Sequence, residues 1–128
     1  MTASDRDLQI LNKIEGYCND IEFTHTEYGH NYATFCENPT YRNAIALCLL
    51  QIGELVKNLS QEFTASHANI PWRAIRGMRN VVAHEYGHID LETVWETTDV
   101  GIIELRDFCV EQLQSNDQQT SFPDLTMQ

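Results

Sequence analysis

The chain has 128 residues, 42% of them hydrophobic and 21% charged, which suffices for one domain around one core and excludes a disordered polyelectrolyte or a collagen-like chain. Eight Lys and Arg against 19 Asp and Glu give a formal net charge of −11. This charge disfavours general coating of nucleic acid, binding to DNA and binding to anionic membranes.

Two further features predict a cytoplasmic protein. No apolar run approaches the roughly 18 residues of a membrane span, and the N-terminal segment lacks the basic and apolar regions of a signal peptide.

The cysteines form no C-x-x-C pair and lie in patterned apolar stretches, so we expect buried, reduced thiols rather than a disulfide framework. They are Cys18, Cys36, Cys48 and Cys109.

The first half of the chain predicts two long helices. Apolar residues recur every three or four positions over 5–23, after a start that resembles a capping box. Residues 24–38 are polar and aromatic, so we expect a short, weak helix or an ordered loop there. Helical spacing over 39–63 predicts the longest helix. Leu47 and Leu50 make its first half apolar nearly all round, and a self-association face explains this most simply.

The second half predicts two more helices and a tail. Pro71 can begin a helix with one apolar stripe, and Gly87 is placed to end it. A further helix is expected over 90–113, whereas residues 115–128 are polar and are expected to be a mobile tail. The expected fold class is all-α: a small antiparallel bundle of four to five helices, in a single domain over 1–114.

Three of the eight basic residues lie within seven positions, at Arg73, Arg76 and Arg79. On a helix they fan across about 120° beside the apolar stripe. They form the one local site for an anion in this acidic chain. The alternative is a solvated helix face whose arginines pair with the abundant carboxylates.

The residues that follow carry further chemistry. Asn80 and His84 are four apart and share one helix face, while Arg79 and Tyr86 are seven apart and share another face, about 140° away. A site that uses all four side chains needs the helix to end near His84, or a second subunit to close the gap.

A competing motif overlaps these residues, because His84 to His88 satisfy H-E-x-x-H, the signature of zinc proteases. Zinc ligation there needs both histidines on one rigid helical turn, and Gly87 weakens that turn. We therefore expect no metal, and a zinc hydrolase stays a remote alternative. The other histidines lack ligand-like spacing and are expected in loops or on the surface: His25, His30 and His67.

The chain strongly resembles the HepT-like branch of the HEPN family in residues 52–55, 70–86, 90–92 and 94–95. The resemblance covers about residues 5–113, and the string Arg-x4-His-x-Tyr in this context is specific to that branch. It implies an all-helical homodimer, HEPN-like in fold, that acts as a metal-independent endoribonuclease toxin on RNA such as tRNA or mRNA, without a cofactor.

The resemblance also implies a partner and a site. The partner is a minimal nucleotidyltransferase antitoxin of the MNT type, which silences the toxin by transferring AMP to a tyrosine. Carried over by matching position, Arg79 and His84 are the catalytic pair and Tyr86 is the AMPylation site.

These residue types suit the implied reaction. RNA supplies its own 2′-hydroxyl as nucleophile, so His84 is needed to exchange protons near neutral pH and Arg79 to offer paired donors to the phosphate oxygens. Arg73 and Arg76 are candidate RNA phosphate contacts. Asn80 is a supporting residue that orients His84 or holds a phosphate, unless it merely bonds the helix end.

The motif contains one histidine per chain, so a separate acid and base need His84 from both subunits of a homodimer. The rival interpretation is a non-catalytic helical partner that docks a nucleotidyltransferase. Because both Arg79 and His84 are present, the enzyme is the favoured interpretation.

Overall fold

The structure, a computed structural model, describes residues 3–85 and 91–126, and the side chains of these residues except at positions 81, 83–85 and 117–126. The described chain is helical and contains no strand, which confirms the predicted all-α bundle. No described helix is both long and apolar enough to cross a membrane. The elements are α1 (Asp5–Glu27), α2 (Tyr32–Glu37), α3 (Pro39–Lys57), α4 (Gln61–Ser66), α5 (Trp72–Glu85), α6 (Leu91–Glu96), the π-helix η2 (Thr97–Gly101) and α7 (Ile102–Thr126).

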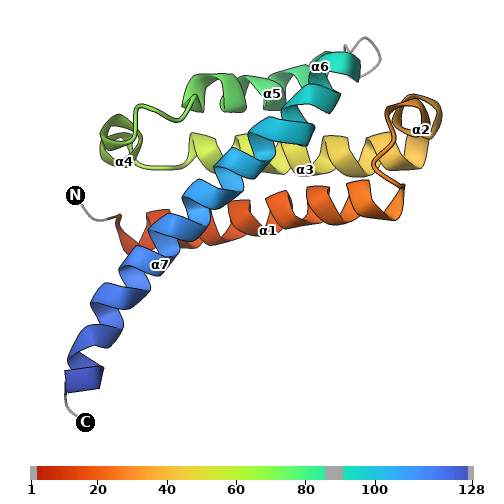
Figure 1. The fold of residues 1–128 in the computed structure, drawn as a ribbon. Helices are drawn as coiled ribbons and strands as arrows, with labels where there is room; N and C mark the ends of the chain where they lie inside the picture. Colours follow the sequence, from red (N-terminus) through yellow and green to blue (C-terminus); the bar gives the residue numbers. More distant parts are fainter. Residues whose placement is uncertain (1–2, 86–90, 127–128) are drawn as a thin grey trace.

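Four longer helices make the bundle and the short ones join them. Figure 1 shows α3 running antiparallel to both α1 and α5, while α7 crosses α1 obliquely. The core is apolar and contains three of the predicted buried thiols, while the fourth, Cys36, is half-buried; all four cysteines are free. The fully buried core residues include Leu11, Ile14, Cys18, Ile21, Phe35, Tyr41, Ile45 and Cys109.

The prediction of one long helix over 39–63 is wrong in one respect, because the observed chain forms two helices there. α3 ends at Lys57, and Ser60 caps the separate helix α4 by accepting a hydrogen bond from Phe63 N at 3.2 Å. The break has a tertiary cause. Buried Asp7 of α1 accepts hydrogen bonds from both Ser60 N (2.8 Å) and Ser60 Oγ (2.7 Å), which holds Ser60 outside either helix.

The helix predicted over 90–113 also differs from the observed chain. It is divided into α6, the π-helix η2 and α7, and α7 continues to Thr126, beyond the domain end predicted at residue 114. Apolar side chains on both sides of the π-helix are nevertheless buried in the core: Val94, Ile102 and Leu105. The wider π turn places Thr98 in the core as well, and that residue meets a buried histidine.

His25 was expected in a loop or on the surface, and this expectation is wrong. α1 extends to Glu27, one turn beyond the predicted end, and buries His25 to 1% exposure. Thr98 Oγ1 donates to the Trp95 carbonyl at 3.2 Å, so it accepts from His25 Nε2–H at 3.0 Å. Nδ1 of His25 therefore accepts from the hydroxyl of Tyr41 at 2.5 Å. The histidine is a hydrogen-bonded part of the core that ties α1 to α3 and η2.

This histidine should make stability depend on pH. Burial, and then the neighbouring His30 ring, lower the pKa of His25 from 6.5 to about 4, so it stays neutral in the folded protein while the unfolded chain takes up a proton below about pH 6.5. Stability should therefore fall as the pH drops from about 6.5 towards 4, by up to about 3 kcal/mol from this group. Urea unfolding across this range should show a shallower dependence for His25→Gln; equal slopes would contradict the assignment.

Gly53 lets α3 and α5 approach each other closely. A Cβ at this position would lie 2.5 Å from the Cβ of Arg79 and 3.2 Å from its backbone nitrogen. Real side chains do not approach so closely, so only glycine is compatible with this packing. The close approach that Gly53 permits is made within one chain, by α5.

We predict that Gly53→Ala forces the two helices apart and destabilises the protein by about 1–3 kcal/mol, the usual cost of overpacking. Gly77→Ala is the matched control, because a Cβ at Gly77 meets nothing within 4 Å. Alanine there should leave stability unchanged or raise it by up to about 1 kcal/mol through helix propensity. Denaturant unfolding of both variants tests this, and an equal loss in the two would refute the role of Gly53.

Candidate active site

The site is built around Arg79, which α5 places directly opposite Gly53 of α3. Its Nε forms an ion pair with Oε1 of Glu54, the next residue along α3. Its Nη1 donates a hydrogen bond to Oδ1 of Asn80 at 3.2 Å. The side chains of Arg79 and Glu54 are 36% and 34% exposed, so their pair contributes at most about 1 kcal/mol to stability. The two paired atoms are buried, and neither has a hydrogen-bond partner among the described residues, so their contact is an ion pair rather than an aligned hydrogen bond.

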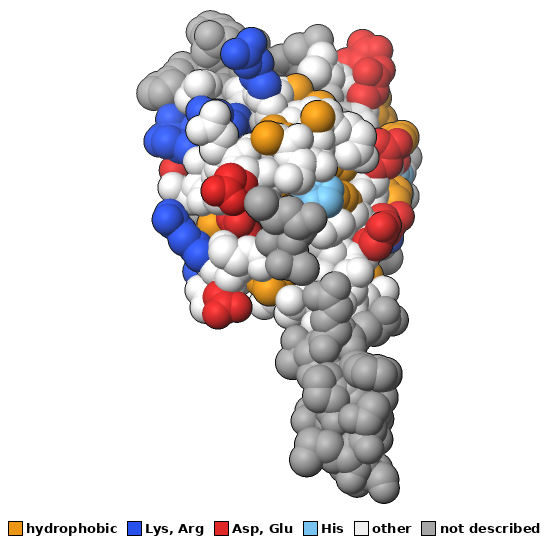
Figure 2. Space-filling model, turned by 90° about the vertical axis from the view of Figure 1, so that its left-hand side faces the viewer, with side chains coloured by type: hydrophobic (Ala, Val, Ile, Leu, Met, Phe, Trp, Pro, Cys, Tyr) orange, Lys and Arg blue, Asp and Glu red, His pale blue; other side chains and the backbone are white. Residues whose placement is uncertain are grey.

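A polar groove of about 390 Å³ surrounds this pair between α3 and α5. It contains four cations and one carboxylate, a formal net charge of +3 within a chain of net charge −11. In Figure 2, most Lys and Arg side chains lie on the left of the face shown, with some Asp and Glu side chains among them, while further Asp and Glu side chains line the right-hand edge. The groove residues are Gly53, Glu54, Lys57, Arg73, Arg76, Gly77, Arg79 and Asn80.

The structure brings together all three arginines that the sequence singled out. Arg73 and Arg76 are exposed and line the groove with Arg79. The alternative, a helix face of arginines paired with carboxylates, describes Arg79 but not the other two, which form no ion pair with a described carboxylate. A row of cations along one groove is an electrostatic site for successive phosphates.

Lys57 completes the cationic groove and was missed by sequence reasoning. It is exposed at the end of α3, one turn after Glu54, and so lies on the same side of that helix. The sequence could have indicated Lys57 only through its position three residues after Glu54, in the stretch 52–55 that carries part of the family resemblance. That position becomes informative only once α3 is known to pack against α5.

Asn80 has a contact that sequence reasoning did not consider. Its side-chain oxygen accepts a hydrogen bond from Arg79, and this contact does not use its side-chain NH₂ group. Asn80 is exposed at the groove, so its place is consistent with a supporting role beside the arginine.

Part of the predicted site lies outside the described residues. The backbone of His84 belongs to the last turn of α5, five residues after Arg79, which corresponds to about 140° around the helix and roughly 7.5 Å along it. The His84 side chain, Tyr86, Gly87 and His88 are not among the described parts. Within the described part of the chain, no group of three or more His, Cys, Asp or Glu side chains is arranged to hold a metal ion.

A second concavity lies on the other side of α5, against α7. It has a volume of about 830 Å³, and its lining is mainly apolar, with carboxylates but no Lys or Arg among the described residues. The apolar side chains Ile75 and Met78 of α5 face this space, while the arginines of the same helix line the polar groove. The helix therefore separates an apolar concavity from a cationic one.

Comparisons with known proteins place the chain in a family. The family model described as "Ribonuclease HepT-like" matches residues 8–112. A protein of Caldanaerobacter subterraneus subsp. tengcongensis named "Putative RNase" is 38% identical over 86 residues, which cover 67% of this chain and 77% of the relative. A protein of Methanocaldococcus jannaschii with the same designation is 34% identical over 103 residues, covering 79% of this chain and 86% of the relative.

A third relative, from Thermococcus cleftensis, is named "Probable ribonuclease HepT" and is 34% identical over 71 residues, covering 56% of this chain and 64% of the relative. No solved structure matches the chain. The family match covers most of the helical bundle, including the cationic groove and the helix that carries Arg79 and His84. The chain therefore belongs to the ribonuclease HepT-like family and is a ribonuclease.

Proposed function

We propose that this ribonuclease is a metal-independent endoribonuclease that cleaves RNA at the groove between α3 and α5, with Arg79 and His84 as its catalytic pair. The observation that carries the proposal is the placement of Arg79 in a groove with three further cations, Lys57, Arg73 and Arg76. His84 follows on the same helix. One side chain that exchanges protons and one that binds phosphate suffice for cleavage by the 2′-hydroxyl of RNA.

The proposed reaction uses no cofactor. The 2′-oxygen attacks the adjacent phosphorus while a histidine accepts its proton, and the bond from phosphorus to the 5′-oxygen breaks as that oxygen gains a proton. His84 suits both proton transfers, because its ordinary pKa lies near neutral pH. Arg79 donates from its planar fork to the non-bridging oxygens, where negative charge grows in the transition state. Asn80 supports Arg79 through the hydrogen bond that it accepts.

The remaining cations of the groove are proposed to hold flanking phosphates. Arg73 and Arg76 are three and six residues before Arg79, so they continue its row towards the start of α5. Lys57 adds a charge from α3. Such contacts set the register of a strand without reading its bases.

The active site is proposed to be shared between two chains of a homodimer, because a separate acid and base require two copies of His84. The exposed apolar surface supports this. Leu47 is 58% exposed and Leu50 is half-buried, as expected of a self-association face. Since α3 and α5 are antiparallel and meet at Gly53 and Arg79, these leucines lie towards the end of the bundle where His84 follows (Figure 1).

We further propose that the enzyme is the toxin of a toxin–antitoxin pair. Its partner would be an MNT-type minimal nucleotidyltransferase that transfers AMP to Tyr86. An AMP group there would place a phosphate and a nucleotide beside His84, where the groove arginines can pair with it as they would with RNA.

The first prediction concerns the chemistry. Purified protein should cleave RNA in EDTA, and Arg79→Ala and His84→Ala should each lower the rate at least a hundredfold, the usual contribution of such groups. His88→Ala should retain activity. Loss of activity in EDTA with recovery on adding zinc would instead support the H-E-x-x-H interpretation.

The second prediction concerns assembly. Sedimentation should show two chains per particle, and Leu47→Asp should shift the protein towards a monomer with reduced activity, because a carboxylate is costly to bury. Lys13→Asp on exposed α1 is a control that should stay dimeric. A wild-type monomer with full activity would contradict the shared site.

The third prediction concerns the tyrosine. With the partner nucleotidyltransferase and ATP, the wild type should gain one or more AMP masses and lose activity, while Tyr86→Phe should cleave RNA and resist silencing. Mass spectrometry and an RNA cleavage assay follow both events. If Tyr86→Phe is still silenced with a gain of AMP, the acceptor is another residue.

A further inference from the structure

We infer that Glu54 is a positioning residue for Arg79, which it orients for binding the scissile phosphate. This inference rests on the proposed function of Arg79. Glu54 contacts the arginine side chain and lies at the groove wall, so it acts on the substrate through Arg79.

The contacts of Arg79 leave part of its guanidinium available for a ligand. Arg79 carries five N–H donors: its Nε lies against Oε1 of Glu54 in an ion pair, and one N–H of Nη1 donates to Asn80. Three donors on the two terminal nitrogens are not used by these two contacts. A guanidinium held through Nε keeps its terminal nitrogens together at the far edge, the edge that grips two phosphate oxygens at once. Glu54 therefore fixes the arginine without consuming its phosphate-binding edge.

Both ends of the Arg79 side chain are thereby fixed by adjacent residues of α3. Gly53 sets how closely the Arg79 backbone approaches, and Glu54 sets where the guanidinium lies. A long side chain with four rotatable bonds, held at both ends, has few orientations left. Gly53 and Glu54 therefore both restrict the position of Arg79.

The negative charge of Glu54 distinguishes a positioning role from a role in binding RNA. Glu54 lowers the positive charge of the groove, so its removal should strengthen the general attraction for RNA. The same removal should loosen the arginine and slow the chemical step. A positioning role therefore predicts a lower kcat without a higher KM, which neither an RNA contact nor a purely structural residue would produce.

The test compares Glu54→Ala with Glu54→Gln in cleavage of an RNA oligonucleotide in EDTA. Both variants remove the same charge, but glutamine keeps an oxygen that can accept from Nε–H. We expect KM to stay equal or fall in both, and kcat to fall at least tenfold in Glu54→Ala and less in Glu54→Gln, as for a catalytic group that has lost its orientation.

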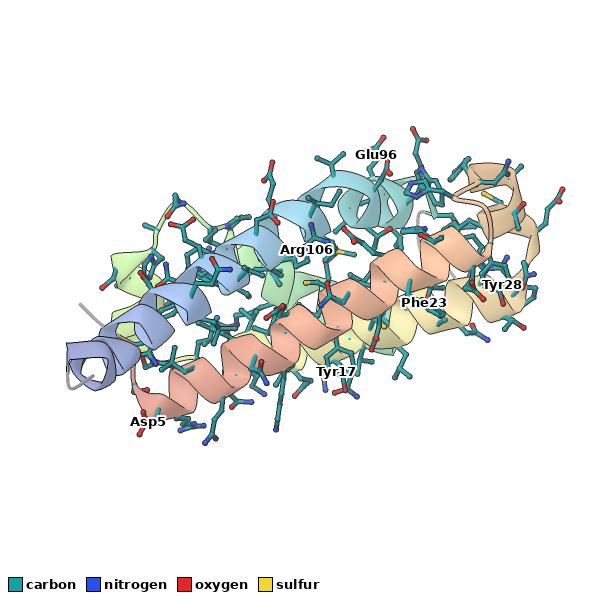
Figure 3. All side chains as sticks on the ribbon, turned by 60° about the horizontal axis from the view of Figure 1, so that its bottom comes forward. Asp5, Tyr17, Phe23, Tyr28, Glu96 and Arg106 are labelled. Carbon is teal, nitrogen blue, oxygen red and sulfur yellow. The ribbon has the colours of Figure 1, made fainter. Side chains whose placement is uncertain are left out.

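Glu22→Ala is the matched control. Glu22 of α1 forms an ion pair with Arg106 of α7, and the two side chains are 40% and 25% exposed. Figure 3 labels Arg106 on α7, where that helix faces α1, far along the chain from the groove residues. The substitution removes a comparable pair and the same charge, so kcat should stay within twofold of the wild type. Thermal unfolding of all variants shows whether any has lost its fold.

A spectroscopic readout does not depend on catalysis. The Nε–H resonance of Arg79, assigned by its loss in Arg79→Lys, should be sharp and slow to exchange with solvent in the wild type. It should shift and broaden in Glu54→Ala but not in Glu22→Ala.

The inference is overturned if Glu54→Ala keeps the wild-type kcat, if Glu22→Ala lowers kcat equally, or if kcat rises in Glu54→Ala because Glu54 competes with phosphate. An unchanged Arg79 resonance in Glu54→Ala also overturns it. A wild type that does not cleave RNA refutes the proposed function instead, and the resonance then still decides whether Glu54 holds Arg79.

Discussion

The close contact between α3 and α5 is the constraint on which the site depends. Without a side chain at Gly53, the backbones approach until Arg79 lies against α3. The same approach brings Glu54 and Lys57 of one helix beside Arg73 and Arg76 of the other. One missing Cβ therefore determines the width of the groove and the set of charges that face into it.

The electrostatics of the chain work at two ranges. The net charge of −11 acts at long distance, where salt screens it over about 8 Å under physiological conditions. Within the groove, the cations act at contact distance and keep their full effect. A polyanion is therefore held where several of its phosphates meet these cations together, while the rest of the chain, in which carboxylates are in excess, repels it.

Much of the fold could be predicted from the sequence because apolar spacing reports the core directly. The errors arise where one tertiary contact overrides the pattern. Nothing in the spacing over 39–63 reveals that Asp7 holds Ser60 outside a helix. Likewise, nothing in the spacing of α1 reveals that a histidine is buried at its last turns. Such contacts join residues far apart in the chain, so local patterns do not contain them.

The site shows the same division. Arg73, Arg76 and Arg79 are close in sequence, and their shared groove follows from helix geometry. Glu54 and Lys57 enter the groove from another helix, so their association with the arginines requires the packing of α3 on α5. Residues 52–55, Ile-Gly-Glu-Leu, carry part of the family resemblance, but the contacts that Gly53 and Glu54 make with Arg79 follow only from the packing of α3 on α5.

The π-helix η2 has a consequence for how this bundle tolerates changes in chain length. In an α-helix, each residue added or removed rotates everything that follows by about 100°. A π turn holds an extra residue without that rotation, so Val94 before it and Ile102 and Leu105 after it can all face one core. Deleting one residue from Thr97–Gly101 would leave an ordinary helix, whereas the same deletion between Ile102 and Leu105 would rotate Leu105 and Cys109 away from the core. The gain or loss of one residue is therefore tolerated best at this turn.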